Sequence, residues 1–144
     1  MEHDLYIGLG SNLGDRKAVI EESLRLIGQR IGRVVRVSSF YESEPWGFVS
    51  ENRFLNAAAF VITSLSPHEC LHEAQHIERL LGRTRKSVNG IYHDRTIDID
   101  LLLYDDLHVT EPELVLPHPG IQERDFVRLP LQEILQHQSL QTCS

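Results

Sequence analysis

The alternation of apolar and polar residues predicts four strands along the chain. Residues 4–10 read as a strand leading into a glycine-rich turn, and residues 34–41, rich in β-branched and aromatic residues, read as a second strand. Residues 54–63 fit a buried third strand. The clearest signal lies in residues 96–104, where one set of apolar residues alternates with a mainly polar set: Ile97, Ile99, Leu101 and Leu103 with Thr96, Asp98, Asp100 and Leu102.

Apolar residues at helical spacing predict two longer helices. After the first strand, four residues spaced four, three and four apart give a helix one buried face: Ile20, Leu24, Ile27 and Ile31. The second helix should begin after Ser66, because Pro67 suits the first helical position and Glu69 completes a capping box. It should run to about Leu81, with Gly82 as its stop.

The C-terminal part is expected to contain turns and one further helix. The tripeptide YDD at 104–106 predicts a turn, and LVLPHPG at 114–120 predicts an extended run into another turn. A short helix is expected over residues 126–135, interrupted near Pro130 because proline lacks the backbone donor that a helix needs.

This order of elements predicts an α+β fold. Strand, helix, strand, strand, helix, strand is typical of the split βαβ, or ferredoxin-like, arrangement, in which two helices cover one face of an antiparallel sheet. Long loops are expected at residues 42–53 and 83–95, where regular patterns are absent. No change of composition marks a boundary, so residues 1–144 are expected to form a single domain.

The composition excludes several classes of protein. At 41% hydrophobic and 24% charged residues, the chain can bury a core, and no apolar run approaches the roughly 18 to 20 residues of a membrane span. Its formal charge of −7 disfavours nucleic acid as a partner. Cys70 and Cys143 lie far apart without a metal-type pair, which argues against a disulfide scaffold. We expect a cytoplasmic monomer with no membrane or nucleic-acid partner.

The strongest candidate for chemistry is a pair of aspartates on the fourth strand. Asp98 and Asp100 are two residues apart, so their carboxylates project from the same face. A solvated sheet face is the alternative, but aspartate is disfavoured in strands, and two like charges about 6 to 7 Å apart repel one another. Mg²⁺ shared with the phosphates of a substrate removes both objections.

The loop before this strand carries the opposite charge. Residues 83–95 contain four basic side chains and one acid, a local charge of +3: Arg83, Arg85, Lys86 and Arg95 against Asp94. Because arginine contacts phosphate oxygens through two donors, the loop is a candidate to close over a phosphate, with an ordinary solvated loop as the alternative.

Three other motifs carry weaker signals. The second helix contains HExxH twice, at residues 68–72 and 72–76, but the three histidines lie opposite its apolar arc and should face solvent, which disfavours zinc catalysis. The glycine turn at 8–14 has the spacing GxGxxxG, a poor cofactor signature. The DxD pair also occurs in nucleotide-sugar transferases, which are usually longer.

Six blocks of sequence, taken together, resemble the 6-hydroxymethyl-7,8-dihydropterin pyrophosphokinase family of folate biosynthesis. They cover nearly the whole chain: YIGLGSNLGDR, SSFYESEPWGF, NRFLNAA, GRTRK, RTIDIDLLLY and LPHPGIQERDFV. The resemblance implies transfer of the β,γ-pyrophosphoryl group of ATP to the hydroxymethyl oxygen of the reduced pterin, with release of AMP. A non-catalytic ferredoxin-like ligand-binding domain remains the alternative.

The resemblance also implies roles for particular residues. Asp98 and Asp100 would hold two Mg²⁺ ions, and Arg83 and Arg95 would join them as catalytic residues. The positions implied for ATP are Gln75, Glu78, Arg83, Arg85, Lys86, Arg95, His118 and Arg124. Those implied for the pterin are Ser43, Glu44, Trp46, Phe54, Asn56, Asp98 and Phe126, with the two phenylalanines enclosing the flat ring.

Overall fold

The computed structural model describes residues 1–12, 14–43, 53–82 and 97–143, with side chains described as far as residue 135. The elements in chain order are β1 (His3–Ser11), α1 (Arg16–Arg30), β2 (Gly32–Val37), β3 (Tyr41–Ser43), β4 (Phe54–Thr63), α2 (Pro67–Leu80), β5 (Asp98–Tyr104), β6 (Val109–Glu111), β7 (Leu114–Leu116), α3 (Gly120–Glu123) and α4 (Asp125–Cys143). None of the helices in these ranges is both long and apolar enough to cross a membrane.

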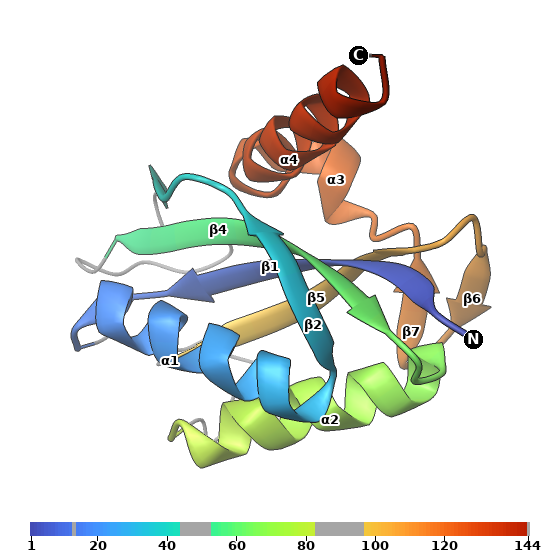
Figure 1. The fold of residues 1–144 in the computed structure, drawn as a ribbon. Helices are drawn as coiled ribbons and strands as arrows, with labels where there is room; N and C mark the ends of the chain where they lie inside the picture. Colours follow the sequence, from blue (N-terminus) through green and yellow to red (C-terminus); the bar gives the residue numbers. More distant parts are fainter. Residues whose placement is uncertain (13, 44–52, 83–96, 144) are drawn as a thin grey trace.

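The main sheet is antiparallel and has the strand order β2-β4-β1-β5, with β3 paired to the first residues of β4. This order places the first and last long strands side by side, as in the predicted ferredoxin-like arrangement, and confirms the α+β class. Strands β6 and β7 form a separate hairpin at one end of the molecule (Figure 1). The predicted bounds of residues 54–63 match β4.

Helices α1 and α2 cover one face of the sheet, as predicted, and the larger part of the core lies beneath them (Figure 1). Ile20 and Ile27 of α1 and Ile77 of α2 are fully buried there. The capping box at Ser66 and Glu69 is present and starts α2 at Pro67. The prediction that both helices pack on the same face of the sheet is therefore confirmed.

A third layer, helix α4, covers the opposite face of the sheet (Figure 1). The prediction of a short helix interrupted near Pro130 is wrong, because α4 continues through this proline to Cys143. Proline removes one backbone hydrogen bond from the helix. Pro130, Leu131 and Ile134 are all fully or almost fully buried against the sheet, and this apolar contact offsets the missing bond.

The predicted strand over residues 34–41 is in fact two strands, β2 and β3. Ser38 lies between them and replaces part of the backbone ladder with its side chain: its N–H donates to the Ala58 carbonyl at 2.9 Å, and its hydroxyl accepts from the Ala58 N–H, also at 2.9 Å. The interruption therefore leaves no unpaired backbone group on Ala58. It also turns β3 toward the start of β4.

Strand β5 contains a bulge that the simple alternation did not predict. Tyr6 of β1 pairs with Leu103, whereas Ile7 pairs with Leu101, so Leu102 is an extra residue. Up to Leu101 the odd-numbered residues face α1 and α2, but Leu102 and Leu103 both pack on the α4 side. The prediction that Leu103 shares a face with Ile99 is therefore wrong, while Asp98 and Asp100, before the bulge, keep their predicted common face.

Candidate functional site

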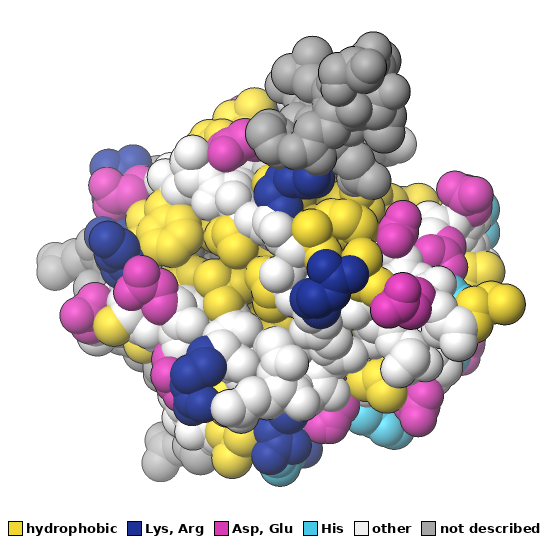
Figure 2. Space-filling model, viewed as in Figure 1, with side chains coloured by type: hydrophobic (Ala, Val, Ile, Leu, Met, Phe, Trp, Pro, Cys, Tyr) yellow, Lys and Arg dark blue, Asp and Glu magenta, His cyan; other side chains and the backbone are white. Residues whose placement is uncertain are grey.

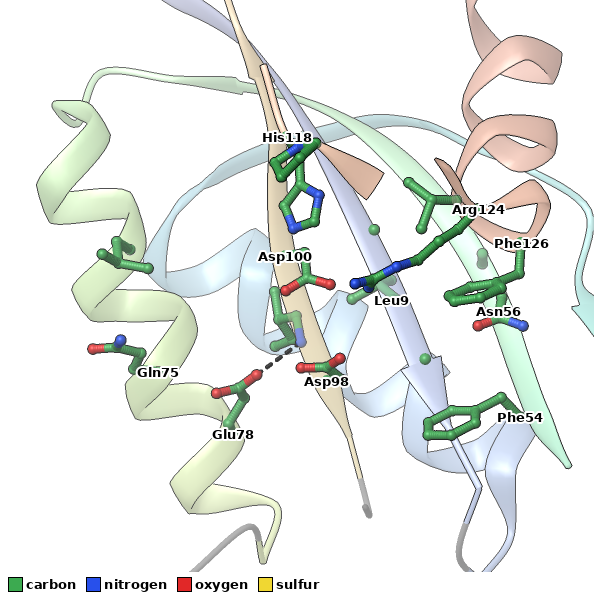
Figure 3. A pocket seen from close by; sticks show the side chains of 17 residues that line it. Leu9, Phe54, Asn56, Gln75, Glu78, Asp98, Asp100, His118, Arg124 and Phe126 are labelled. Carbon is green, nitrogen blue, oxygen red and sulfur yellow. Dashed lines mark hydrogen bonds between the residues drawn. The ribbon is translucent and has the colours of Figure 1, made fainter. Parts of the chain in front are cut away.

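A pocket of about 510 Å³ lies around β5 and reaches from α2 to the start of α4. Its size falls within the usual range for a small-molecule site. Nine of the residues proposed for ligand binding line it: Phe54, Asn56, Gln75, Glu78, Asp98, Asp100, His118, Arg124 and Phe126. Figure 3 shows the two carboxylates between the α2 residues on one side and the aromatic residues on the other.

Asp98 and Asp100 are half-buried and line the same pocket. Their partners on β1 are glycines, Gly10 opposite Asp98 and Gly8 opposite Asp100. Because glycine has no side chain, the space beside the carboxylates stays open above β1. A Cβ at Gly10 would lie 3.2 Å from Asn56 Oδ1 and 3.4 Å from the Phe54 ring, so even a methyl group would narrow the pocket.

Glu78 connects α2 to β5 by a hydrogen bond to the residue between the two aspartates. The Ile99 N–H donates to Glu78 Oε2 at 2.8 Å, and the Glu78 side chain is buried (Figure 3). The bond therefore fixes the backbone between Asp98 and Asp100. Gln75 is exposed and lies three residues earlier on α2, at the mouth of the same pocket.

His118 and Arg124 bring nitrogen donors to the carboxylates. The Gly120 N–H donates to His118 Nδ1 at 2.9 Å, so the neutral imidazole carries its proton on Nε2. Burial first, and then the charge of Arg124, lower the pKa of His118 against the opposing effects of Asp98 and Glu123. Figure 3 shows the Arg124 side chain extended across β1 toward the aspartates.

The other side of the pocket is aromatic and holds one oriented amide. Phe54 at the start of β4 and Phe126 at the start of α4 place their rings to the right of the carboxylates, with Asn56 beside Phe126 (Figure 3). The Asn56 amide nitrogen donates to the Tyr41 carbonyl at 3.0 Å and to Ser43 Oγ at 2.8 Å. Because both N–H groups are used, Oδ1 is left as an acceptor.

Helix α4 holds the strand that orients this amide. Glu133 accepts hydrogen bonds from the Tyr41 hydroxyl at 2.6 Å, the Ser39 N–H at 2.9 Å and the Ser39 hydroxyl at 3.1 Å. Burial raises the pKa of Glu133, but the three hydrogen bonds lower it below its ordinary value overall. Glu133 thus connects α4 through Tyr41 to Asn56.

Not every predicted site residue is placed in the pocket. Ser43 does not line it but orients Asn56 through its hydroxyl. Six predicted residues lie outside the described residues: Glu44, Trp46, Arg83, Arg85, Lys86 and Arg95. Sequence reasoning gave no role to Gly8 and Gly10, although a glycine inside a strand pattern is a known signal of close approach by a ligand.

The two HExxH motifs do not form a catalytic zinc site in this structure. His68 and His72 are exposed and His76 is half-buried, none of them lines the pocket, and the apolar arc of α2 faces the sheet. The helical-wheel argument is therefore confirmed for His68 and His72.

The fold and the pocket together define a class of protein: a ferredoxin-like α+β enzyme with paired carboxylates and an adjoining aromatic subsite. A model of the family 7,8-dihydro-6-hydroxymethylpterin-pyrophosphokinase (HPPK) matches residues 6–136, and the chain belongs to this family. It is accordingly a pyrophosphokinase of folate biosynthesis, which confirms the family and the activity that the sequence predicted.

Individual relatives agree with this assignment. The 2-amino-4-hydroxy-6-hydroxymethyldihydropteridine pyrophosphokinase of Porphyromonas gingivalis is 51% identical over 131 residues, covering 90% of this chain and 89% of the relative. The Bacillus subtilis protein of the same name is 42% identical over 137 residues, covering 94% of this chain and 80% of its own.

Solved structures support the fold. A Plasmodium falciparum HPPK-DHPS structure superposes with a TM-score of 0.73 at 16% identity, covering 92% of this chain. This chain spans 42% of the length of that structure.

Proposed function

We propose that this pocket is the site of pyrophosphoryl transfer from ATP to the reduced pterin, with Asp98 and Asp100 as its Mg²⁺ ligands. The observation that carries the proposal is the pair of carboxylates on one face of β5, in a pocket with aromatic rings on one side, His118 above Asp100 and the Arg124 side chain extended toward the aspartates. The donor set fits Mg²⁺, because carboxylate oxygens are its preferred protein ligands and the glycines opposite leave room for phosphate oxygens. Asp98 and Asp100 would hold two Mg²⁺ ions, which would supply positive charge to the triphosphate.

The aromatic side suits the flat pterin ring. Phe54 and Phe126 provide faces for stacking, and Asn56 Oδ1 can accept a hydrogen bond from a ring N–H. Asp98 lies between this subsite and the phosphate side, so we assign it to orientation of the hydroxymethyl group as well as to metal binding. Trp46 and the main chain at Ser43 and Glu44 are further pterin contacts in this proposal.

The part of the pocket that extends from the aspartates to His118 and α2 suits the nucleotide. His118 presents its Nε2–H, and Arg124 its guanidinium, as donors to phosphate or ribose oxygens. Gln75 and Glu78 line the α2 end, where the nucleoside would lie. On the family resemblance we add Arg83, Arg85, Lys86 and Arg95 as phosphate ligands, with Arg83 and Arg95 stabilising charge in the transition state.

The reaction that follows is a direct displacement. The hydroxymethyl oxygen attacks the β-phosphorus and releases its proton, while the bond from that phosphorus to the oxygen that bridges it to the α-phosphate breaks and AMP leaves with that oxygen. No bond forms between substrate and protein. Positioning and charge stabilisation supply the rate enhancement. We propose that residues 1–144 carry out this reaction as one domain and as a monomer.

A product assay tests the proposal against a non-catalytic binding domain. The protein is incubated with MgATP, with and without 6-hydroxymethyl-7,8-dihydropterin, and the nucleotides are separated by chromatography. We expect AMP, and not ADP, only when the pterin is present. ADP as the product, or hydrolysis that ignores the pterin, would overturn the assignment. Sedimentation analysis of the same sample tests the monomer.

A further inference from the structure

Three side chains that commonly bind metals meet outside the pocket, at the end of the molecule formed by the start of α2 and the β6–β7 hairpin. His68 Nε2 lies 3.2 Å from Glu111 Oε1 and 3.8 Å from Glu113 Oε1, and the three ligand atoms all lie within 4.8 Å of one another. Figure 2 shows acidic and histidine side chains gathered at the right-hand end of the molecule, where Figure 1 places β6 and β7.

The spacing of these atoms suits a transition-metal ion. Zn²⁺ binds imidazole nitrogen and carboxylate oxygen at about 2.0 to 2.2 Å, so two ligands of a tetrahedral ion lie about 3.4 Å apart. The two distances from His68 lie on either side of this value. The three side chains are 44 to 52% exposed, so small side-chain rotations can bring the three ligand atoms to bonding distance from one ion. Water can then complete the coordination shell of that ion.

The charge of the cluster also favours binding of a cation. In the described part of the chain, no lysine or arginine forms an ion pair with Glu111 or Glu113, and the His68 imidazole is the group that contacts both. With a neutral imidazole the group carries two negative charges. The N-terminus of α2 contributes roughly half a positive charge, which balances only part of them.

The backbone holds the three ligands in place without a metal. Pro67 and the capping box fix the first turn of α2, where His68 lies. The hairpin is anchored from below, because Leu114 and Leu116 of β7 are buried in the main core. The backbone positions that carry the ligands are therefore brought together by the first turn of α2 and by the end of β6 with the turn that follows it, which lowers the entropy cost of binding.

We propose that His68, Glu111 and Glu113 form a surface site for a divalent transition-metal ion of the zinc type, which links the start of α2 to the β6–β7 hairpin. The imidazole selects such an ion over Mg²⁺, which prefers a shell of oxygen ligands. The site is separate from the pocket: Gln75, the nearest of the α2 residues proposed to bind ATP, lies seven residues along the helix, or about 10 Å.

Calorimetric titration with ZnCl₂ tests the site, with excess Mg²⁺ present to occupy the carboxylates of the pocket. The variants are His68→Ala and Glu111→Gln, and the matched control is His72→Ala, which removes an exposed histidine one turn further along the same helix. Loss of a direct ligand should weaken Zn²⁺ binding by at least about tenfold, since even outer-shell changes cost 10- to 100-fold. Wild type and His72→Ala should bind one equivalent equally well.

Thermal unfolding gives a second readout. Zn²⁺ should raise the melting temperature of wild type and of His72→Ala but not of His68→Ala or Glu111→Gln, because it binds the folded hairpin and helix together. Equal titrations of wild type and His68→Ala would overturn the proposal. So would a loss in both histidine variants with Glu111→Gln unchanged, because the site would then be a histidine pair on α2 alone. AMP formation should be unchanged in all three variants in the absence of zinc.

Discussion

The Asn56 amide offers a sharp test of how the aromatic subsite is oriented. Asn56 is 4% exposed, and its nitrogen donates to the Tyr41 carbonyl and to the Ser43 hydroxyl. Aspartate has the same shape but no N–H, so Asn56→Asp brings a carboxylate oxygen against the Tyr41 carbonyl. The Ser43 hydroxyl can rotate and donate to the new carboxylate, because a hydroxyl is both donor and acceptor. The damage therefore falls mainly on the contact with Tyr41.

The expected cost follows from that contact. The lost hydrogen bond contributes about 1 kcal/mol, and setting a carboxylate oxygen against the part-buried Tyr41 carbonyl adds about 1 to 2 kcal/mol. Asn56→Asp should thus lower the free energy of unfolding by about 2 to 3 kcal/mol at neutral pH. Burial beside a carbonyl should raise the pKa of the new carboxyl in the folded state above its unfolded value. The cost should shrink as the pH falls, because the protonated acid can donate to Tyr41 again.

Urea unfolding of wild type, Asn56→Asp, Ser43→Ala and the double variant measures these terms. Ser43→Ala alone should cost about 1 kcal/mol, by removing one acceptor. It should cost more in the Asn56→Asp background, where Ser43 donates to a charged group, so the double-variant cycle should show coupling. A cost for Asn56→Asp within about 0.5 kcal/mol of zero, the range of ordinary surface changes, would refute the assigned orientation. A cost that grows as the pH falls would refute it too.

Two further variants probe the proposed Mg²⁺ ligands and the link to α4. Asp98→Ala should abolish AMP formation and should abolish Mg²⁺-dependent ATP binding in calorimetry. The free energy of unfolding should stay unchanged or rise slightly, because the substitution relieves repulsion with Asp100. Gross unfolding of the variant, or activity equal to that of wild type, would show that the carboxylates are structural. Glu133 has a lowered pKa, so its carboxylate stabilises the fold above the ordinary value of 4.5, and that stability is lost as the pH falls through its folded-state pKa. Glu133→Gln should therefore show a flatter acid branch in unfolding measured against pH, and curves that run parallel to wild type would contradict the network.

Much of the fold could be predicted because the short-range sequence patterns agree with the way each element packs in the folded protein. Ser66 and Glu69 fix the start of α2 by hydrogen bonds within four residues, so no distant contact is needed to place that helix end. The periodic apolar residues of α1 likewise report which face of the helix is buried, and the continuous apolar run of β4 reports burial on both faces of the strand. In each case the evidence lies within a single element.

The predictions that were wrong, for the helix at Pro130 and for the face of Leu103, concern segments whose local structure is decided by contacts with residues far away in the sequence. The helix continues past Pro130 because its neighbours pack on the far face of the sheet, and the stretch around it does not show that burial. The bulge at Leu102 depends on how β5 registers with β1, and an apolar residue fits either face. In both cases the same local sequence fits two structures that differ only in the distant residues they contact.

The candidate site shows the same division. Asp98 and Asp100 stood out because aspartate is disfavoured in strands and because their like charges lie close together on one face. Gly8 and Gly10 were assigned only to a glycine-rich turn, so the sequence pattern gave them no role in the site. Their role becomes visible through the register that sets each glycine opposite an aspartate. Gly10 also leaves room for the Asn56 oxygen, which a Cβ would approach to 3.2 Å. In the proposed site the aspartates would bind Mg²⁺, and the pairing of β5 with the glycines of β1 leaves the space for the phosphates beside them.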